Sequence, residues 1–321
     1  MNSEKKLLLI ANLQAGQKRI GKKLAEVLEV FCKSGYLPTV VCTLYPGHAR
    51  ELAVQHAQDY DIVVCAGGDG TLNETVTGLL SLNKKLPLGY LPCGTTNDLA
   101  STLTLSRDLV QAAKDVVEGK KISLDVGLFN KRYFAYTASF GVFTRASYET
   151  SQYTKNVLGH LAYLLEGIKD LANLKSVFAK IKTDTEELSG EFLFGAVSNT
   201  TSLAGILTID KSRVLLDDGK FEVLLVDMPR NAIEMSRLLA NITQKKYEAP
   251  IHLLSSKCID VETKEPLNWT LDGEFEKGNM KFHIENLHSA LTFIIGGRES
   301  PPVGEINKVE ENAPDNDDAA E

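Results

Sequence analysis

The sequence predicts two unlike parts: an α/β domain of the doubly wound type, followed by an antiparallel β-sandwich. Two observations carry this prediction. Before Gly119, short apolar runs alternate with amphipathic helical segments, which is typical of a parallel sheet with helices on both faces. After Gly119, short alternating runs separated by turn residues favour antiparallel strands. We therefore expect domains over residues 1–120 and 121–300, and a tail over residues 301–321.

The α/β part should contain strands and helices in alternation. Apolar residues spaced three and four apart from Ile20 to Phe31 mark the first helix, which ends at Gly35. The expected strands cover residues 7–11, 37–43, 61–66 and 87–91, and the further helices cover 46–58, 71–82 and 106–118. Ligands of such sheets bind beyond the carboxyl ends of the strands, so the loops there are the first candidates for a site.

The second part should consist of short strands with two interrupting helices. The strand-like runs cover residues 122–126, 133–139, 177–183, 192–199, 221–226, 258–262, 280–285 and 291–295. The expected helices cover about 155–174 and 230–242.

A glycine-rich segment, GGDGTLNE over residues 67–74, directly follows the apolar run 61–66. Its three glycines let the backbone turn sharply and approach a ligand closely, and Thr71 should cap the helix that follows. Asp69 is unusual in such a place because a bare carboxylate repels phosphates. It fits only with Mg²⁺, an ordered water or a basic partner between the charges. The alternative is a glycine-rich turn without a ligand.

A second segment, CGTTNDLA over residues 93–100, also follows a short apolar run and opens into an amphipathic stretch. Free N–H groups and the positive end of a helix dipole make each such loop a phosphate site. Two of them side by side predict a nucleotide with several phosphates. Neither has the Gly-Lys-Ser/Thr ending of a Walker A loop or the spacing of a dinucleotide fingerprint.

Two acidic turns in the second part are further candidates. Asp272 and Glu274 flank Gly273, and in an extended backbone their side chains would point to one face. Such a pair can divide the work between a base and a ligand for metal or water. The other turn is Leu-Leu-Asp-Asp-Gly-Lys over residues 215–220. From the residues alone, an ordinary exposed turn is the favoured interpretation of both.

Composition limits the partners. Residues 304–321 hold seven acids and one lysine, so most of the net charge of −7 lies in this tail, whose composition favours disorder. The nearly neutral remainder argues against a nucleic-acid partner. The five scattered cysteines lack a CxxC pair and indicate reduced thiols, as in the cytoplasm. No apolar run is long enough to span a membrane, so work on a lipid would be done from the membrane surface.

Taken in order, the motifs at 67–74, 93–100 and 271–274 resemble those of the diacylglycerol kinase family of bacterial lipid kinases. The first motif also resembles one in NAD kinases and phosphofructokinases, whereas the second is more specific to the lipid kinases. One departure is Asn12-Leu13, where the family usually has Asn-Pro. The resemblance also implies that the last strand, 291–295, returns to the first domain.

The resemblance implies an ATP-dependent lipid kinase with Mg²⁺, for which diacylglycerol is the expected acceptor and phosphatidic acid the product. It implies Glu274 as the base, with Asp272 as the alternative, and Asp69 as the organiser of metal and water. The implied ATP-binding residues are Asn12, Gly16, Thr43, Gly67, Gly68, Asp69, Gly70, Thr71, Leu72, Asn73, Glu74, Thr95, Asn97 and Asp98. It further implies a structural Mg²⁺ held by the Asp218 side chain and the backbone carbonyls of Leu215 and Lys220.

Three points stay open at this stage. One alternative is an NAD kinase-like enzyme with a soluble substrate, and another is a nucleotide-binding regulator without catalysis. The sequence does not distinguish diacylglycerol from phosphatidylglycerol or a sphingoid base as acceptor. We expect a cytoplasmic protein that binds the membrane surface peripherally, and neither composition nor motifs decide whether it forms a homodimer.

Overall fold

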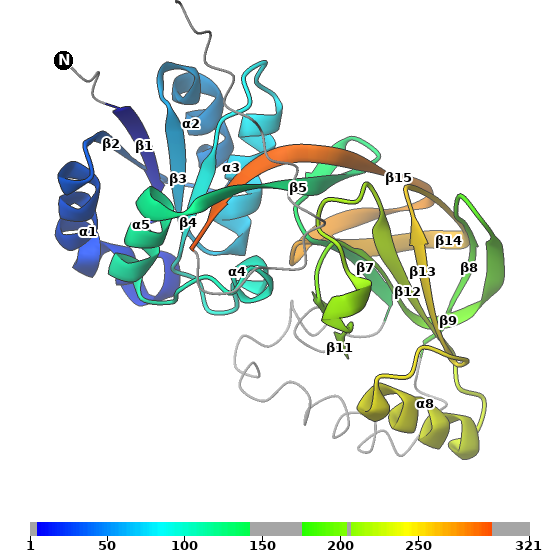
Figure 1. Cartoon of the computed structure of the whole chain (residues 1–321). Coiled ribbons are helices and arrows are strands. Elements are labelled where there is room, and N and C mark those ends of the chain that lie inside the picture. The colour runs from blue at the N-terminus through cyan, green and yellow to red at the C-terminus, as the bar shows by residue number, and fades with distance from the viewer. Residues whose placement is uncertain (1–4, 142–174, 204–206, 297–321) are drawn as a thin grey trace, which may run out of the picture.

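The computed structural model describes residues 5–141, 175–203 and 207–296 (Figure 1). It has the predicted fold class, an α/β part followed by an antiparallel β-rich part. The helix expected over 155–174 and the tail expected over 301–321 lie outside the described residues.

The α/β part is built on parallel strands in the order β4-β3-β1-β2. These are β1 (Lys5–Ala11), β2 (Tyr36–Cys42), β3 (Ile62–Gly67) and β4 (Leu88–Pro92). The helices are α1 (Ala15–Lys33), α2 (His48–His56), the short η1 (Ala57–Asp59), α3 (Asp69–Leu80) and α5 (Leu109–Glu118). Leu7 and Leu9 are buried with α1 and α5, whereas Leu8 and Ile10 are buried with α2 and α3, so helices cover both faces.

One detail of this part differs from the prediction, and one completes it. Helix α3 begins at Asp69, with Gly68 at its N-cap and no side-chain cap, so the expected capping role of Thr71 is wrong. A short helix, α4 (Asp98–Thr102), follows the second glycine-rich segment, where the sequence predicts the start of a helix without giving its bounds. Its five residues are too few to display a helical period.

The β-rich part surrounds a second core that contains Phe129, Phe140 and Trp269. Its first strands are β5 (Lys120–Phe129), β6 (Arg132–Phe134), β7 (Thr137–Gly141), β8 (Val177–Lys182) and β9 (Glu187–Ser198). The later ones are β10 (Ser202–Leu203), β11 (Leu207–Thr208), β12 (Phe221–Asp227), β13 (Ile251–Ser256) and β14 (Cys258–Leu271), with η3 (Lys211–Arg213) and helix α8 (Ala232–Gln244) between them. β14 pairs with β7 and β8, and β9 pairs with both as well, so the strands wrap around this core.

One long strand, β15 (Glu274–Ile295), replaces the two predicted runs 280–285 and 291–295. Its register against β5 shifts between Leu287 and Leu291, and this irregular stretch hides the continuity in the sequence. At Phe293 the strand pairs in parallel with Leu88 of β4, so β15 returns to the α/β part.

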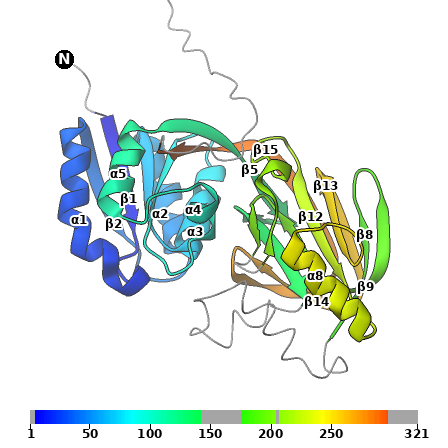
Figure 2. The ribbon, with the colours of Figure 1, turned by 60° about the horizontal axis from the view of Figure 1, so that its bottom comes forward.

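Strands β5 and β15 bridge the two parts, which lie side by side (Figures 1 and 2). One continuous sheet therefore runs through the molecule. The predicted boundary at residue 120 falls on the first residue of β5, and the domain bounds themselves stay a prediction.

Candidate active site

The two glycine-rich segments meet beyond the carboxyl ends of β3 and β4. The Gly67 carbonyl accepts hydrogen bonds from the N–H groups of Cys93 at 2.7 Å and Gly94 at 3.2 Å. A Cβ atom on Gly94 would lie 2.7 Å from the Gly68 Cα, which is closer than such contacts allow. The second segment therefore needs glycine at position 94, where the two segments touch, and they form one surface rather than two separate sites.

The loop after β1 joins this surface. Asn12 donates from Nδ2 to the Thr71 hydroxyl at 3.1 Å. Gly16 has a φ of +52°, and a Cβ atom there would clash with the carbonyl oxygen of Cys93. Arg19, which no sequence motif singles out, donates to the carbonyl oxygens of Pro92, just before the second segment, at 3.4 Å and of Arg107, beyond it, at 2.6 Å. The three loops are thus locked together by contacts that depend on Asn12 and Gly16.

Asp69 stands at the start of α3, where it accepts a hydrogen bond from the Asn97 N–H at 2.8 Å. Its other oxygen, Oδ1, is buried and has no hydrogen-bond partner among the described residues. Burial, and then the charge of Asp98, raise the pKa of Asp69 to about 7. Burial and the charge of Asp272 likewise raise the pKa of Asp98 to about 6. The charge of each neighbouring carboxylate therefore disfavours ionisation of the next, and a cation beside Asp69 would relieve this repulsion.

Asp272 is the first residue of the two-residue turn between β14 and β15, with φ of +48° followed by +85° at Gly273. The predicted Asp-Gly turn is real, but Asp272 is only 2% exposed. Its carboxylate accepts from Asn73 Nδ2 and the Ala135 N–H at 2.6 Å each, and from the N–H groups of Tyr136 and Thr137 at 3.0 Å each. Burial raises the pKa of Asp272, and these four hydrogen bonds oppose the shift.

Glu274, the first residue of β15, is exposed and faces the start of α3. A Cβ atom on Gly70 would lie 3.0 Å from Glu274 Oε1, so the carboxylate lies directly beside the first glycine-rich segment. The expectation that Asp272 and Glu274 share one face of an extended strand is wrong, because a left-handed turn separates them. Of the two, only Glu274 is open to a substrate hydroxyl.

Other predicted ATP-binding residues hold the loops in place. Both oxygens of Glu74 accept from the start of α2, from Gly47 N–H at 2.7 Å and Ala49 N–H at 3.1 Å. These two bonds fix the start of α2, which follows Thr43 in the chain. The N–H of Thr43 itself donates to the Ala11 carbonyl at 3.0 Å. Leu72 is fully buried in the core. Thr95 is exposed at the tip of its segment. Contacts of these residues with ATP stay predictions.

The turn over residues 215–220 is the second acidic turn that the sequence singles out. Asp218 accepts from the Lys220 N–H at 2.9 Å, and burial is the main cause that raises the pKa of Asp218. The Gly219 N–H donates to the fully buried Asp125 at 2.7 Å. Among the described residues, no three His, Cys, Asp or Glu side chains are grouped to hold a metal. An ion here would therefore depend on backbone carbonyls and water as well, as the predicted ligand set requires.

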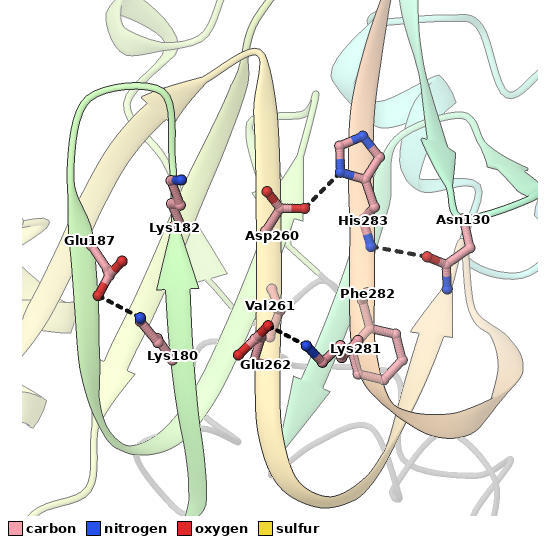
Figure 3. A pocket seen from close by; sticks show the side chains of 10 residues that line it. All are labelled: Asn130, Lys180, Lys182, Glu187, Asp260, Val261, Glu262, Lys281, Phe282 and His283. Atoms are coloured by element: carbon pink, nitrogen blue, oxygen red, sulfur yellow. Dashed lines mark hydrogen bonds and ion pairs between the residues drawn. The ribbon is translucent and has the colours of Figure 1, made fainter.

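A hollow of about 450 Å³ lies elsewhere, on the outer face of β8, β14 and β15 (Figure 3). Two of its lysines are neutralised by ion pairs, Lys180 with Glu187 at 3.0 Å and Lys281 with Glu262 at 2.8 Å. It contains none of the predicted site residues, so the chemistry is not placed there.

A kinase site needs loops that hold phosphates, a place for a cation and a carboxylate that can meet an acceptor. Here the three loops, the carboxylates of Asp69 and Asp98, and Glu274 occur together, and they define a nucleotide-dependent phosphotransferase. Residues 6–129 match the family model described as the diacylglycerol kinase catalytic domain.

Related proteins agree with this match. The chain is 32% identical to a diacylglycerol kinase of Staphylococcus saprophyticus over 88% of its length and 94% of the relative. It is 33% identical to a diacylglycerol kinase of Bacillus subtilis, over 84% of this chain and 90% of the relative. A crystal structure of a Bacillus anthracis protein assigned as a diacylglycerol kinase matches with a TM-score of 0.76 and 26% identity, covering 92% of this chain and 99% of that chain. The chain belongs to the diacylglycerol kinase family and is an ATP-dependent lipid kinase.

Proposed function

We propose that the protein transfers the γ-phosphate of ATP to the free hydroxyl of diacylglycerol and releases phosphatidic acid. The observation that carries this proposal is the position of Glu274, whose carboxylate lies beside Gly70 at the start of α3. The names of the relatives support diacylglycerol as the acceptor. The same comparisons favour a lipid kinase over an NAD kinase-like enzyme and over a regulator without catalysis.

The site residues divide into binding and orienting groups. The free N–H groups of the glycine-rich loops hold the phosphates, because no side chain there obstructs close approach. Glu274 accepts the hydrogen of the acceptor hydroxyl and points its oxygen at the γ-phosphorus. Since phosphoryl transfer has a loose transition state, this orientation matters more than strong basicity.

Asp69 and Asp98 fit a Mg²⁺ ion that arrives with ATP. The partnerless, buried Oδ1 of Asp69 is the kind of atom that such an ion or its water would satisfy. Bound Mg²⁺ offsets the charge of the phosphate oxygens. A second, structural Mg²⁺ would use the Asp218 carboxylate and the carbonyls of Leu215 and Lys220.

The acceptor reaches the site from a membrane surface, to which the protein binds peripherally. Within the described residues, no helix combines the length and apolar character needed to cross a bilayer. Diacylglycerol remains in the bilayer, so its hydroxyl must be met at the interface.

An acceptor panel tests the proposed function. Purified protein is incubated with labelled ATP and, in separate mixed micelles, dioleoylglycerol, phosphatidylglycerol or a sphingoid base, with NAD as the soluble acceptor. We expect labelled phosphatidic acid as the dominant product. Transfer to NAD alone, or ATP binding without transfer to any acceptor, would contradict the proposal.

A further inference from the structure

Tyr90 is a buried tyrosine of β4 whose hydroxyl lies between the two glycine-rich segments. The residue is only 2% exposed, and it belongs to the same core cluster as Leu72 of α3 and Leu99 of α4. Its hydroxyl donates to the carbonyl oxygen of Gly67 at 3.2 Å and to Asn97 Oδ1 at 3.1 Å. Packing in the core requires the aromatic ring but not the hydroxyl, which is costly in a buried position unless it makes hydrogen bonds.

The two acceptors depend on Tyr90 to different degrees. The Gly67 carbonyl also accepts from the N–H groups of Cys93 and Gly94, so it keeps partners without the hydroxyl. Asn97 Oδ1 accepts from no other donor in the described part of the chain, and Asn97 is only 1% exposed. Burial raises the pKa of Tyr90 well above its usual range, so the hydroxyl keeps its proton and remains a donor. The hydroxyl therefore matters chiefly for the Asn97 side chain.

Asn97 joins the second glycine-rich segment to Asp69. It has a left-handed backbone, with φ of +53° and ψ of +60°, directly before α4. Its Nδ2 donates to the Gly94 carbonyl at 2.8 Å, so both ends of its side-chain amide are held. In this conformation its backbone N–H donates to Asp69 Oδ2 at 2.8 Å. The orientation of the Asp69 carboxylate thus depends on how Asn97 is held.

We infer that Tyr90 is a positioning residue of the active site: by holding the Asn97 side chain, it fixes the backbone N–H that orients the Asp69 carboxylate. The inference rests on the proposed role of Asp69 at the phosphates and their Mg²⁺, and it adds to that role a residue outside the sequence motifs. Asp69 Oδ1 is the oxygen without a partner among the described residues, so it is the one left for Mg²⁺ or its water. A turned carboxylate should therefore affect Mg²⁺-dependent steps more than the binding of nucleotide itself.

Tyr90→Phe tests the inference, because it keeps the ring and removes only the hydroxyl. We expect kcat with dioleoylglycerol to fall by about 10- to 100-fold, the range for residues that support a metal site, while the KM for dioleoylglycerol stays close to that of the wild type. A second measurement needs no turnover: calorimetry with a non-hydrolysable ATP analogue, in Mg²⁺ and in EDTA. The variant should lose about 10-fold of its affinity in Mg²⁺ and little in EDTA.

A matched control removes a hydroxyl elsewhere in the chain. Tyr247 follows α8, and its hydroxyl accepts from the Asp210 N–H at 2.9 Å. Tyr247→Phe should leave kcat and both affinities unchanged. Each of the two variants loses a hydrogen bond and should melt a few degrees lower, so the melting temperature alone does not distinguish them. Tyr90→Leu also lacks the hydroxyl and replaces Tyr90→Phe if that variant does not fold.

A double variant tests the route through Asn97. Glycine tolerates the left-handed backbone of position 97, so Asn97→Gly removes the side chain without backbone strain. In this background Tyr90→Phe should have no further effect on kcat, because the contact through which it acts is already gone.

Two results would overturn the inference. Wild-type kcat and Mg²⁺-dependent affinity in a folded Tyr90→Phe would show that Tyr90 is a core residue only. Equal losses of kcat from Tyr90→Phe in the wild type and in Asn97→Gly would show that it does not act through Asn97. Failure of the proposed role of Asp69 gives a different result, because Asp69→Asn would then turn over at the wild-type rate, whatever Tyr90→Phe does.

Discussion

Asn73 donates a hydrogen bond of 2.6 Å to Asp272, and this bond joins helix α3 of the α/β part to the β14–β15 turn of the β-rich part. The two residues are 199 positions apart in the chain. Because Glu274 is only two residues beyond Asp272, the same bond fixes where the Glu274 carboxylate lies relative to Gly70. Asp272 is thus a positioning residue that sets the geometry of the site.

Asp272→Asn should destabilise the protein. The substitution places an amide nitrogen where backbone N–H groups donate, so we expect the free energy of unfolding to fall by about 2–4 kcal/mol. Urea unfolding followed by the fluorescence of Trp269, the single tryptophan of the sequence, measures this loss. The exposed control Asp260→Asn should change stability by less than about 0.5 kcal/mol. Unchanged stability with lost turnover would instead make Asp272 the base.

Asp69→Asn should abolish turnover yet stabilise the nucleotide-free protein at pH 8. The pKa of Asp69 is raised to about 7 in the folded protein, so the folded state keeps its proton between about pH 4 and 7 while the unfolded chain loses it. This group's contribution to stability is therefore full below about pH 4 and lost as the pH rises through 7.

The neutral amide of the Asp69→Asn variant does not ionise, so the variant avoids the loss of stability that the carboxylate causes as the pH rises. We expect a gain of at most about 4 kcal/mol at pH 8 that shrinks toward zero near pH 4, measured by thermal unfolding across this range. A wild-type turnover rate in Asp69→Asn would show that Asp69 does not organise the phosphates or their metal.

Gly16→Ala and Gly21→Ala form a matched pair within α1. Gly16 has a φ of +52° and touches Cys93, so the added methyl group must push the loop after β1 away from the second glycine-rich segment. We expect ATP affinity to fall at least about 10-fold and stability to fall by more than about 1 kcal/mol. A Cβ atom added at Gly21 would meet no atom within 4 Å, so its alanine variant should be up to about 1 kcal/mol more stable and bind ATP normally. Equal ATP affinities in the two variants, measured by calorimetry, would contradict the role of the Gly16 contact.

The fold class and the main loops follow from local sequence. Apolar runs such as 61–66 and the glycines after them determine both a buried parallel strand and its sharp exit, so the pattern alone predicts them. Strand β13 escaped the prediction because its sequence, IHLLSS, does not alternate between apolar and polar residues, and the bounds of α4 could not be given because five residues are too few to show a helical period. The continuity of β15 was hidden by its irregular stretch before Leu291.

The division of roles between Asp272 and Glu274 could not be predicted from the residues. Asp272 receives its hydrogen bonds from backbone N–H groups of residues 135–137, which carry no side-chain signal in the sequence. The same holds for Glu74, whose partners are N–H groups at the start of α2. Long-range backbone donors decide which carboxylates are structural and which stay free.

Whether Glu274 orients the acceptor hydroxyl is decided most directly by the turnover of Glu274→Gln with dioleoylglycerol, measured together with its ATP affinity. We expect a kcat lower by roughly 10²- to 10⁴-fold, as for a lost general base, with ATP affinity and melting temperature close to those of the wild type. The matched variant Glu276→Gln, two residues along β15, should keep a kcat within a few-fold of the wild type. Near-normal turnover in Glu274→Gln would contradict this role of Glu274 and return the role of base to another carboxylate.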